Sequence, residues 1–479
     1  MKVERKRRTA ESRISSRKAR SVGSLRWVCA GLLTLLTAAG IFLCPVIASG
    51  ASPDDLFREA RRWELGHEEF VPDDPAMTRK HGIYQSYRAA AGEGHVEAMY
   101  RLAHLNSARI NAEWLESAAL LGHGEAFREL KDSGSRLTLN AEIQAIAEEE
   151  LDVVLKKYSV AGRQTGGCIL VAEPKTGRML AMAYRVPAES CAFRYEPGGS
   201  FFPVTVAAAL DSGKLALEEK IDCSRITSPA GLGGVGAGQG RAFVIADILR
   251  KTCNPGIVRL AWKLGIPAYR KYMAAFGFAS PSGGVLEDSE ERHLACVLPD
   301  EPDEQKRGEQ FLSMVSCGRL WPVTPLQMLQ FYAAISNGGV RAAPVLLENV
   351  KKGDARIMSA EAAEKVKQAL AEASGVGLKK ERNAELRLIG KSGTAHRMKP
   401  DGRYDGGRYT LSYAGIMTVG RKELVCVVVL DDPDPRVCRE GGGLKVCAPI
   451  FRNVARRLVP AGNVSENPAE SIELKKKIR

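Results

Sequence analysis

Residues 195–204, YEPGGSFFPV, have the composition of a helix start that presents a reactive side chain. Ser200 supplies the aliphatic hydroxyl of this stretch. A serine hydroxyl attacks a carbonyl only when a nearby base takes its proton. One helical turn later stands Pro203, which cannot act as a base. Ser200 therefore either recruits a distant base such as Lys391 or simply opens the helix, as Ser often does.

Two further clusters combine hydroxyl, amide and amine groups. Thr252-Cys253-Asn254 precedes an apolar-periodic segment, and the alternative is a buried helix start that Asn caps. Lys391-Ser392-Gly393-Thr394 precedes segments with strand composition, although a bare Lys-Ser-Gly also occurs in surface turns. These clusters lie far apart in the sequence, so a fold must bring them together before they can act on one ligand.

Several other chemistries are not supported by the sequence. The loop at 231–240 contains a GxGxxG pattern, but no strand precedes it and no helix start follows, so we expect no nucleotide site. GHEEF at 66–70 is not the HExxH of zinc peptidases. The eleven cysteines include no CxxC pair, and we expect no metal and no cofactor. Cys438 and Cys447 either form a disulfide across a hairpin or stay unpaired.

The elements that must position the clusters indicate a mixed α and β domain over about 134–460. Residues 135–158 predict a short strand and a long helix. Residues 166–184 predict two strands around a Pro-Lys-Thr-Gly turn. Helices, a glycine-rich loop and more helices follow, and the strands at 409–419 and 423–432 complete the sheet.

The amino-terminal region predicts an exported protein. Residues 1–26 contain ten Lys or Arg and two Glu, and therefore hold most of the net charge of +13. The folded part has no basic stripe with interleaved aromatics, so we expect no nucleic-acid partner. Residues 27–49 contain no charge and are long enough to span a bilayer, with the basic tail in the cytoplasm. A cleaved signal peptide is the alternative.

Residues 50–133 predict helices with an internal repeat. AAAGEGHVEAMYRLAHL and SAALLGHGEAFREL both place a Gly-His pair before a helix, at Gly94-His95 and Gly122-His123. The two copies resemble Sel1-type repeats, relatives of the tetratricopeptide repeat. Such repeats imply a surface for a partner protein, and the alternative is a helical spacer that leans on the next domain.

Six segments in order resemble the transpeptidase domain of penicillin-binding proteins. They are LTLNAEIQ, VAEPKTGRMLAMA, YEPGGSFFPVTVAAAL, LRKTCNPGIVRLAWKLG, WPVTPLQMLQFYAAISNGGVRAAPVLL and IGKSGTAHR. The resemblance covers about 134–460. It implies an antiparallel sheet flanked by helices, an all-helical subdomain, and a role like that of the single-pass class B members, which cross-link peptidoglycan during elongation or division. The elongated pedestal of class B proteins is not recognisable here.

The resemblance also assigns roles to the three clusters. Lys391, Ser392, Gly393 and Thr394 would bind the peptide and its carboxylate along a strand edge. Thr252 stands where the family has Ser, and with Asn254 it would relay protons and hold the substrate. The first cluster departs from the family, because Gly199 stands at the position of the serine nucleophile and Phe202 at that of its lysine base. Ser200 is one residue late, about 100° around a helix.

The sequence thus predicts a membrane-anchored envelope protein with a catalytically degenerate transpeptidase fold. It would bind peptidoglycan stem peptides, β-lactams without covalent capture, or division and elongation proteins. The alternatives are an active D,D-transpeptidase or carboxypeptidase that uses Ser200, and a scaffold that acts through its repeats. The expected divisions are a cytoplasmic tail (1–26), a membrane segment (27–49), a repeat segment (50–133), the transpeptidase-like domain (134–460) and a basic tail (461–479).

Overall fold

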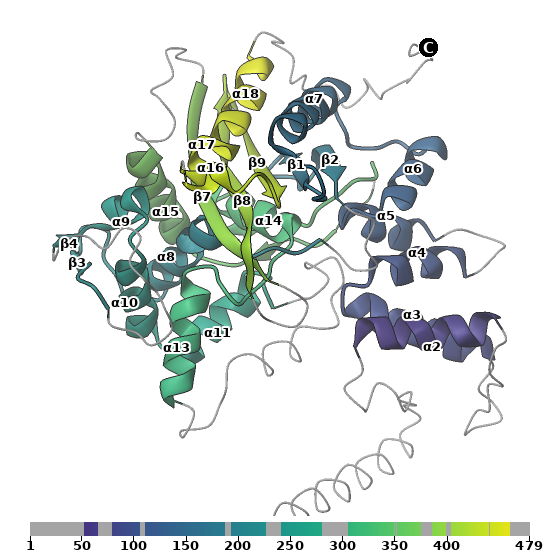
Figure 1. The fold of residues 1–479 in the computed structure, drawn as a ribbon, viewed down its shortest axis with the longest axis horizontal. Helices are drawn as coiled ribbons and strands as arrows, with labels where there is room; N and C mark the ends of the chain where they lie inside the picture. Colours follow the sequence, from purple (N-terminus) through teal and green to yellow (C-terminus); the bar gives the residue numbers. More distant parts are fainter. Residues whose placement is uncertain are drawn as a thin grey trace, which may run out of the picture. The chain divides into compact units, whose positions relative to one another are not determined.

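A computed structural model describes most of the folded chain (Figure 1). The described residues are 52–65, 79–105, 111–186, 193–226, 241–279, 305–348, 350, 352–374, 386–398, 404–439 and 441–459. The predicted basic tails, the membrane segment at 27–49, GHEEF and the glycine-rich loop at 231–240 lie outside these residues. Within the described ranges, no helix combines the length and apolar character that crossing a membrane requires.

The chain divides into two compact units between Ser86 and Tyr87. In the first unit lies helix α2 (Pro53–Leu65), which carries Asp54 and Asp55 in its first turn, where they complement the helix dipole. Helix α3 (Arg79–Gly92) crosses the boundary. Residues 87–133 of the predicted repeat segment therefore belong to the second unit, together with the residues that follow them in the chain.

The Gly-His pairs begin two helices of the second unit. Gly94 and Gly122 have positive φ angles of 85° and 96°, which suit a chain reversal after a helix. His95 and His123 then cap α4 (Val96–His104) and α6 (Gly124–Asp132), because each Nδ1 accepts a hydrogen bond from the backbone N–H three residues later at 3.1 Å. The pairs are thus start signals for helices. Between them lies α5 (Ala112–Leu120), which Asn111 caps.

Helix α5 is attached to the sheet-containing part of the same unit through a buried carboxylate. Glu116 is fully buried, and its Oε1 accepts hydrogen bonds from the backbone N–H groups of Leu346 and Leu347 at 2.8 and 3.0 Å. Its Oε2 lies 2.8 Å from Lys352 Nζ. A buried charge with these partners fixes the position of α5 against Leu346, Leu347 and Lys352. The helical segment is therefore an integral part of this unit.

An antiparallel five-stranded sheet lies at the centre, in the order β2-β1-β9-β8-β7. The strands are β1 (Gly166–Ala172), β2 (Met179–Arg185), β7 (Leu386–Met398), β8 (Tyr404–Val419) and β9 (Lys422–Asp431). β1 and β2 form the predicted hairpin around the Pro-Lys-Thr-Gly turn. The predicted mixed fold with an antiparallel sheet is confirmed, and β7 is one of the two edge strands, with β2 at the other edge.

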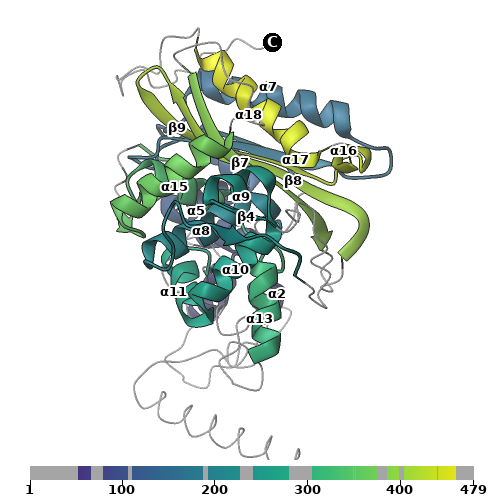
Figure 2. The same cartoon turned by 90° about the vertical axis from the view of Figure 1, so that its left-hand side faces the viewer.

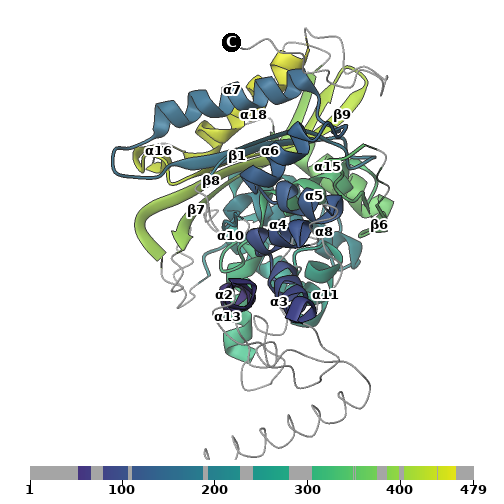
Figure 3. The same cartoon turned by 90° about the vertical axis from the view of Figure 1, so that its right-hand side faces the viewer.

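Helices cover both faces of the sheet (Figures 2 and 3). On one face lie α7 (Ala141–Tyr158) and α18 (Cys447–Leu458), which pack together over a core that includes Ile146, Leu151 and Phe451. The opposite face carries α14 (Pro325–Ser336), α15 (Ala360–Ala373) and α8 (Phe202–Asp211). Beyond α8 lie α9 (Ile245–Lys251), α10 (Asn254–Leu264), α11 (Ile266–Ala275) and α13 (Gln305–Ser316), the predicted helical subdomain. Two small ribbons pair β3 (Ile221–Asp222) with β4 (Ala242–Phe243) and β5 (Val340–Arg341) with β6 (Ala355–Arg356).

The possible disulfide between Cys438 and Cys447 is not present. Both are free cysteines. The segment between them forms short helices rather than a hairpin: Cys438 lies in α16 (Arg436–Arg439), α17 (Gly442–Lys445) follows, and Cys447 begins α18. The chain instead contains a disulfide between Cys223 and Cys253.

Candidate functional site

The stretch from Tyr195 onward is braced before it enters α8. Residues Gly198–Phe201 form a 3₁₀ turn, η2, and α8 follows directly. Gly198 has a φ of 53°, and its N–H donates to Gly318 O at 2.9 Å. Tyr332 on α14 donates its hydroxyl to Ser200 O at 2.9 Å. This turn is therefore fixed on two sides and held against β7.

The edge strand β7 carries Lys391, Ser392, Gly393 and Thr394. Lys391 and Gly393 share one face, because side chains alternate along a strand. At Gly393 an added Cβ would lie 2.0 Å from Pro197 O, so only glycine allows the turn to approach this closely. Ser392 is half-buried, and Thr394 is exposed, with its Oγ1 accepting from Gly443 N–H at 3.1 Å.

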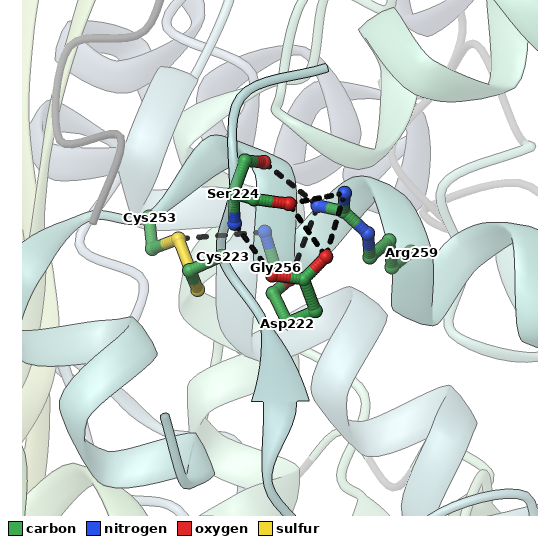
Figure 4. The surroundings of a disulfide bond; sticks show 6 residues. All are labelled: Asp222, Cys223, Ser224, Cys253, Gly256 and Arg259. Atoms are coloured by element: carbon green, nitrogen blue, oxygen red, sulfur yellow. Dashed lines mark hydrogen bonds and ion pairs between the residues drawn. A yellow bond between two sulfur atoms is a disulfide. The ribbon is translucent and has the colours of Figure 1, made fainter. Parts of the chain in front are cut away.

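The second cluster forms the turn between α9 and α10. Figure 4 shows Cys253 of this cluster in a disulfide with Cys223. Thr252 adopts the left-handed conformation, with φ 52° and ψ 54°, which is uncommon for a β-branched residue. Cys253 caps α10 and is bonded to Cys223, which follows β3 directly. Asn254 begins α10 and is half-buried. The disulfide therefore attaches this turn to the small ribbon beside it.

The structure brings Lys391 and Thr252 together. Lys391 Nζ lies 2.9 Å from Thr252 Oγ1 and 3.2 Å from Ser392 O, and 5.6 Å from the centre of the Phe202 ring. Only 6% of Lys391 is exposed. Burial lowers the pKa of its ammonium to about 8, because desolvation disfavours the charged form. Among the described residues, no carboxylate forms an ion pair with Lys391.

Gly199 lies between the two other clusters. A Cβ at Gly199 would lie 2.9 Å from Ser392 O, 3.2 Å from Thr252 Cγ2 and 3.4 Å from Lys391 Nζ. The position that resembles the nucleophile in sequence therefore also faces the other clusters in space. Its surroundings are closed around a glycine, since a side chain would press on the backbone of β7. Phe202 is fully buried, with its ring near the Lys391 ammonium.

Ser200 faces another direction. It is fully buried, its hydroxyl donates to Pro197 O at 2.8 Å, and it lies 3.0 Å from Ser412 Oγ on β8. An added Cβ at Gly393 would lie 3.0 Å from Ser200 Oγ. Its hydroxyl thus ties η2 to the sheet. No hydrogen bond joins Ser200 to Lys391 in the described part of the chain.

Two features of the site escape sequence reasoning. The sequence does not indicate the left-handed conformation of Thr252, because the residue usually found in this conformation at a helix end is glycine or Asn. The Cys223–Cys253 disulfide joins residues 30 apart in sequence, and the spacing alone does not distinguish it from other pairings. As to metals, the described residues contain no group of three His, Cys, Asp or Glu side chains suited to hold an ion.

Comparisons with known proteins agree with one another. Residues 167–456 match the penicillin binding protein transpeptidase domain. Stage V sporulation protein D of Bacillus subtilis is 29% identical over 369 residues, which cover 68% of this chain and 53% of that protein. Penicillin-binding protein PbpB of Mycobacterium tuberculosis is 25% identical over 375 residues, covering 69% of this chain and 53% of that protein. The chain thus spans about half the length of these relatives.

Solved structures share the fold. The transpeptidase domain of Burkholderia pseudomallei penicillin-binding protein 3 has a TM-score of 0.55 and 21% identity, and the match covers 69% of this chain and 97% of that one. Penicillin binding protein 3 of Mycobacterium tuberculosis complexed with ampicillin has a TM-score of 0.54 and 23% identity, with 70% and 80% covered.

Proposed function

The chain belongs to the penicillin-binding protein transpeptidase family, and from that premise we propose that it binds peptidoglycan stem peptides without forming a serine acyl-enzyme. The binding site would be the β7-edge site, which we define as Lys391, Ser392, Gly393 and Thr394 together with Thr252 and Asn254. In this proposal the protein takes part in peptidoglycan synthesis or cell division through binding.

The observation that carries this proposal is the ammonium of Lys391. It is buried, and no carboxylate of the described residues pairs with it. A buried ammonium that has neutral hydrogen-bond partners but no carboxylate beside it is costly, so its presence favours an anionic ligand that completes an ion pair. Because β7 is the sheet edge, an extended peptide can add along it with its carboxylate near Lys391.

The surroundings of Gly199 and Phe202 support the loss of the serine reaction. Glycine has no side chain to attack a carbonyl, and phenylalanine cannot accept a proton. Loss of nucleophile and base in a comparable hydrolase costs on the order of a million-fold in turnover. The 2.9 Å between a Cβ at 199 and Ser392 O indicates that the backbone has adapted to glycine.

The alternative in which Ser200 acts as the nucleophile has little support from geometry. Ser200 is fully buried, and its hydroxyl is committed to Pro197 O and Ser412. A nucleophile needs a base within hydrogen-bond reach, and the residues that contact this hydroxyl include none. Ser200 is better explained as a support for η2.

The remaining parts of the proposal concern the amino-terminal regions. Residues 27–49 would anchor the protein in the membrane, with the bulk of the chain on the extracytoplasmic side. The helices with the Gly-His pairs would be degenerate Sel1-like repeats. They would offer a surface to other envelope proteins while Glu116 holds them in register with the peptide-binding part.

A binding experiment tests the proposal. The full chain is titrated calorimetrically with a synthetic stem peptide that ends in D-alanyl-D-alanine. Lys391→Met should weaken binding about 10- to 100-fold, because a hydrogen bond to a charged group contributes about 1.5–3 kcal/mol. Lys365→Met, which removes a lysine that pairs with Glu361 on α15 and belongs to no part of the β7-edge site, is the matched control. Absence of binding by the folded wild-type protein, or equal binding by Lys391→Met, would refute the proposal.

A further inference from the structure

The contact between Thr252 and Lys391 has the layout of a nucleophile and its base. A hydroxyl and an amine lie 2.9 Å apart, within the distance for proton transfer. Thr252 is half-buried rather than sealed. The two groups come from the α9–α10 turn and from β7, and both face the position of Gly199, where a Cβ would lie 3.2 Å from Thr252 Cγ2 and 3.4 Å from Lys391 Nζ.

The backbone of Thr252 adds a second, independent observation. A left-handed conformation costs a non-glycine residue free energy, more so when it is β-branched. Strained residues of this kind cluster at functional sites. The strain here is held by α9, since Thr252 N–H donates to Leu249 O and Cys253 N–H to Ile248 O, and by the Cys223–Cys253 disulfide on the other side (Figure 4). The turn thus keeps a costly threonine where glycine would be relaxed.

From this geometry we propose that Thr252 is a substitute nucleophile and Lys391 its general base, which together take an acyl group from a β-lactam or a similarly activated amide. This inference rests on the proposed function, because it places the ligand at the β7-edge site. The proposal assigns the covalent step to Thr252 of the second cluster and Lys391 of the third. The first cluster has Gly199 and Phe202 in place of the reactive groups of the family.

Lys391 is suited to the role of base. Its pKa of about 8 leaves part of the side chain neutral near neutral pH. The neutral amine can donate N–H to Ser392 O at 3.2 Å and direct its lone pair to the Thr252 hydroxyl. The described groups that face it are this hydroxyl, the Ser392 carbonyl and the Phe202 ring. None of them titrates near neutral pH, so the protonation of Lys391 itself controls the step.

The reaction is balanced without any further reagent. Thr252 Oγ1 attacks the lactam carbonyl carbon, and the hydroxyl proton passes to Lys391 Nζ. The carbon–nitrogen bond of the ring then breaks, and the Lys391 ammonium returns the proton to the ring nitrogen. The product is an ester on Thr252 that retains every atom of the lactam, so the mass of the protein increases by one lactam.

The test is covalent labelling of the full chain with benzylpenicillin, followed by intact mass measurement and peptide mapping. We expect a slow single adduct on the peptide that contains Thr252. Its rate should increase as the pH is raised through the pKa of Lys391, which is about 8 in the free protein and higher once a ligand carboxylate lies beside it. Thr252→Ser should retain labelling. Thr252→Gly should lose it at least 100-fold, although glycine suits the left-handed turn and the variant should fold. Lys391→Met should slow labelling 100-fold or more.

The outcomes that overturn the inference are clear. A folded protein without any adduct after prolonged incubation, an adduct on Ser200, or undiminished labelling of Thr252→Gly would each refute it. Failure of the proposed function would look different. Absence of stem-peptide binding by the folded wild-type protein in calorimetry, or equal binding by Lys391→Met, refutes the binding site itself. Stem-peptide binding by the wild type without labelling refutes only the nucleophilic role of Thr252.

Discussion

Replacement of Lys391 by Met should stabilise the protein at neutral pH. The folded state holds the pKa of this lysine at about 8, below the ordinary value of 10.5, through burial. A shift of one unit corresponds to 1.36 kcal/mol, so the charged lysine costs the folded state about 3 kcal/mol. Met keeps the apolar stem and loses the hydrogen bond to Thr252, worth about 1 kcal/mol. The net expected gain at pH 7 is therefore about 2 kcal/mol.

The pH dependence follows from the direction of the shift. Below pH 8 Lys391 is protonated in both the folded and the unfolded state, and the folded state bears the full free-energy cost of burying the charge. Between pH 8 and 10.5 the folded state has released a proton that the unfolded state still binds, so wild-type stability increases with pH. Above 10.5 the cost disappears. The stability advantage of Lys391→Met should thus shrink across this range.

Urea unfolding of the full chain at pH 7, 8.5 and 10, followed by tryptophan fluorescence, measures both effects. Lys365→Met is the matched control, because Lys365 is a partly exposed helix residue paired with Glu361. Its effect should stay below about 0.5 kcal/mol at each pH. A Lys391→Met protein that is less stable than wild type at pH 7, with a difference that does not vary with pH, would refute the reasoning.

Three further predictions concern the supports of the site. Glu116→Ala should lower the unfolding free energy by about 3 kcal/mol and speed proteolytic release of the helical segment, whereas Glu113→Ala should change neither; an unchanged digestion pattern would contradict the anchoring role. The double replacement of Cys223 and Cys253 by Ser should cost about 3–4 kcal/mol, and a reducing agent should lower the melting temperature of the wild type alone; equal sensitivity of both proteins would count against the disulfide. Gly199→Ser should lower stability by about 1–3 kcal/mol in thermal denaturation, because its Cβ presses on Ser392 O; a stabilised variant would show that the backbone is not closed around glycine.

The order of motifs in the sequence predicted much of the fold around the site. The hairpin of β1 and β2 follows from alternating apolar residues and turn chemistry, which act locally. The antiparallel arrangement of the sheet and the position of Lys391 on a strand follow from the family resemblance. The meeting of Lys391 with Thr252 and the facing position of Gly199 follow from the family resemblance, and the distances fit it.

What the sequence did not predict depends on tertiary context. Glu116 lies in a helix of ordinary composition, and only the fold shows that its carboxylate satisfies two backbone N–H groups. Thr252 is held left-handed by bonds to α9 and by the disulfide, none of which leaves a local pattern. The possible pairing of Cys438 with Cys447 was wrong because the intervening glycines form a helix rather than a hairpin.

The anchoring of α5 by Glu116 limits how this protein can be divided or recombined. The matched family region, residues 167–456, begins after α5 and α7. A fragment with those bounds would leave the N–H groups of Leu346 and Leu347 without their acceptor and would uncover the apolar core under α7. To move the transpeptidase-family domain of this chain into another protein, one would therefore have to include α5 and α7. The smallest part that can be transplanted intact is larger than the part by which the family is recognised.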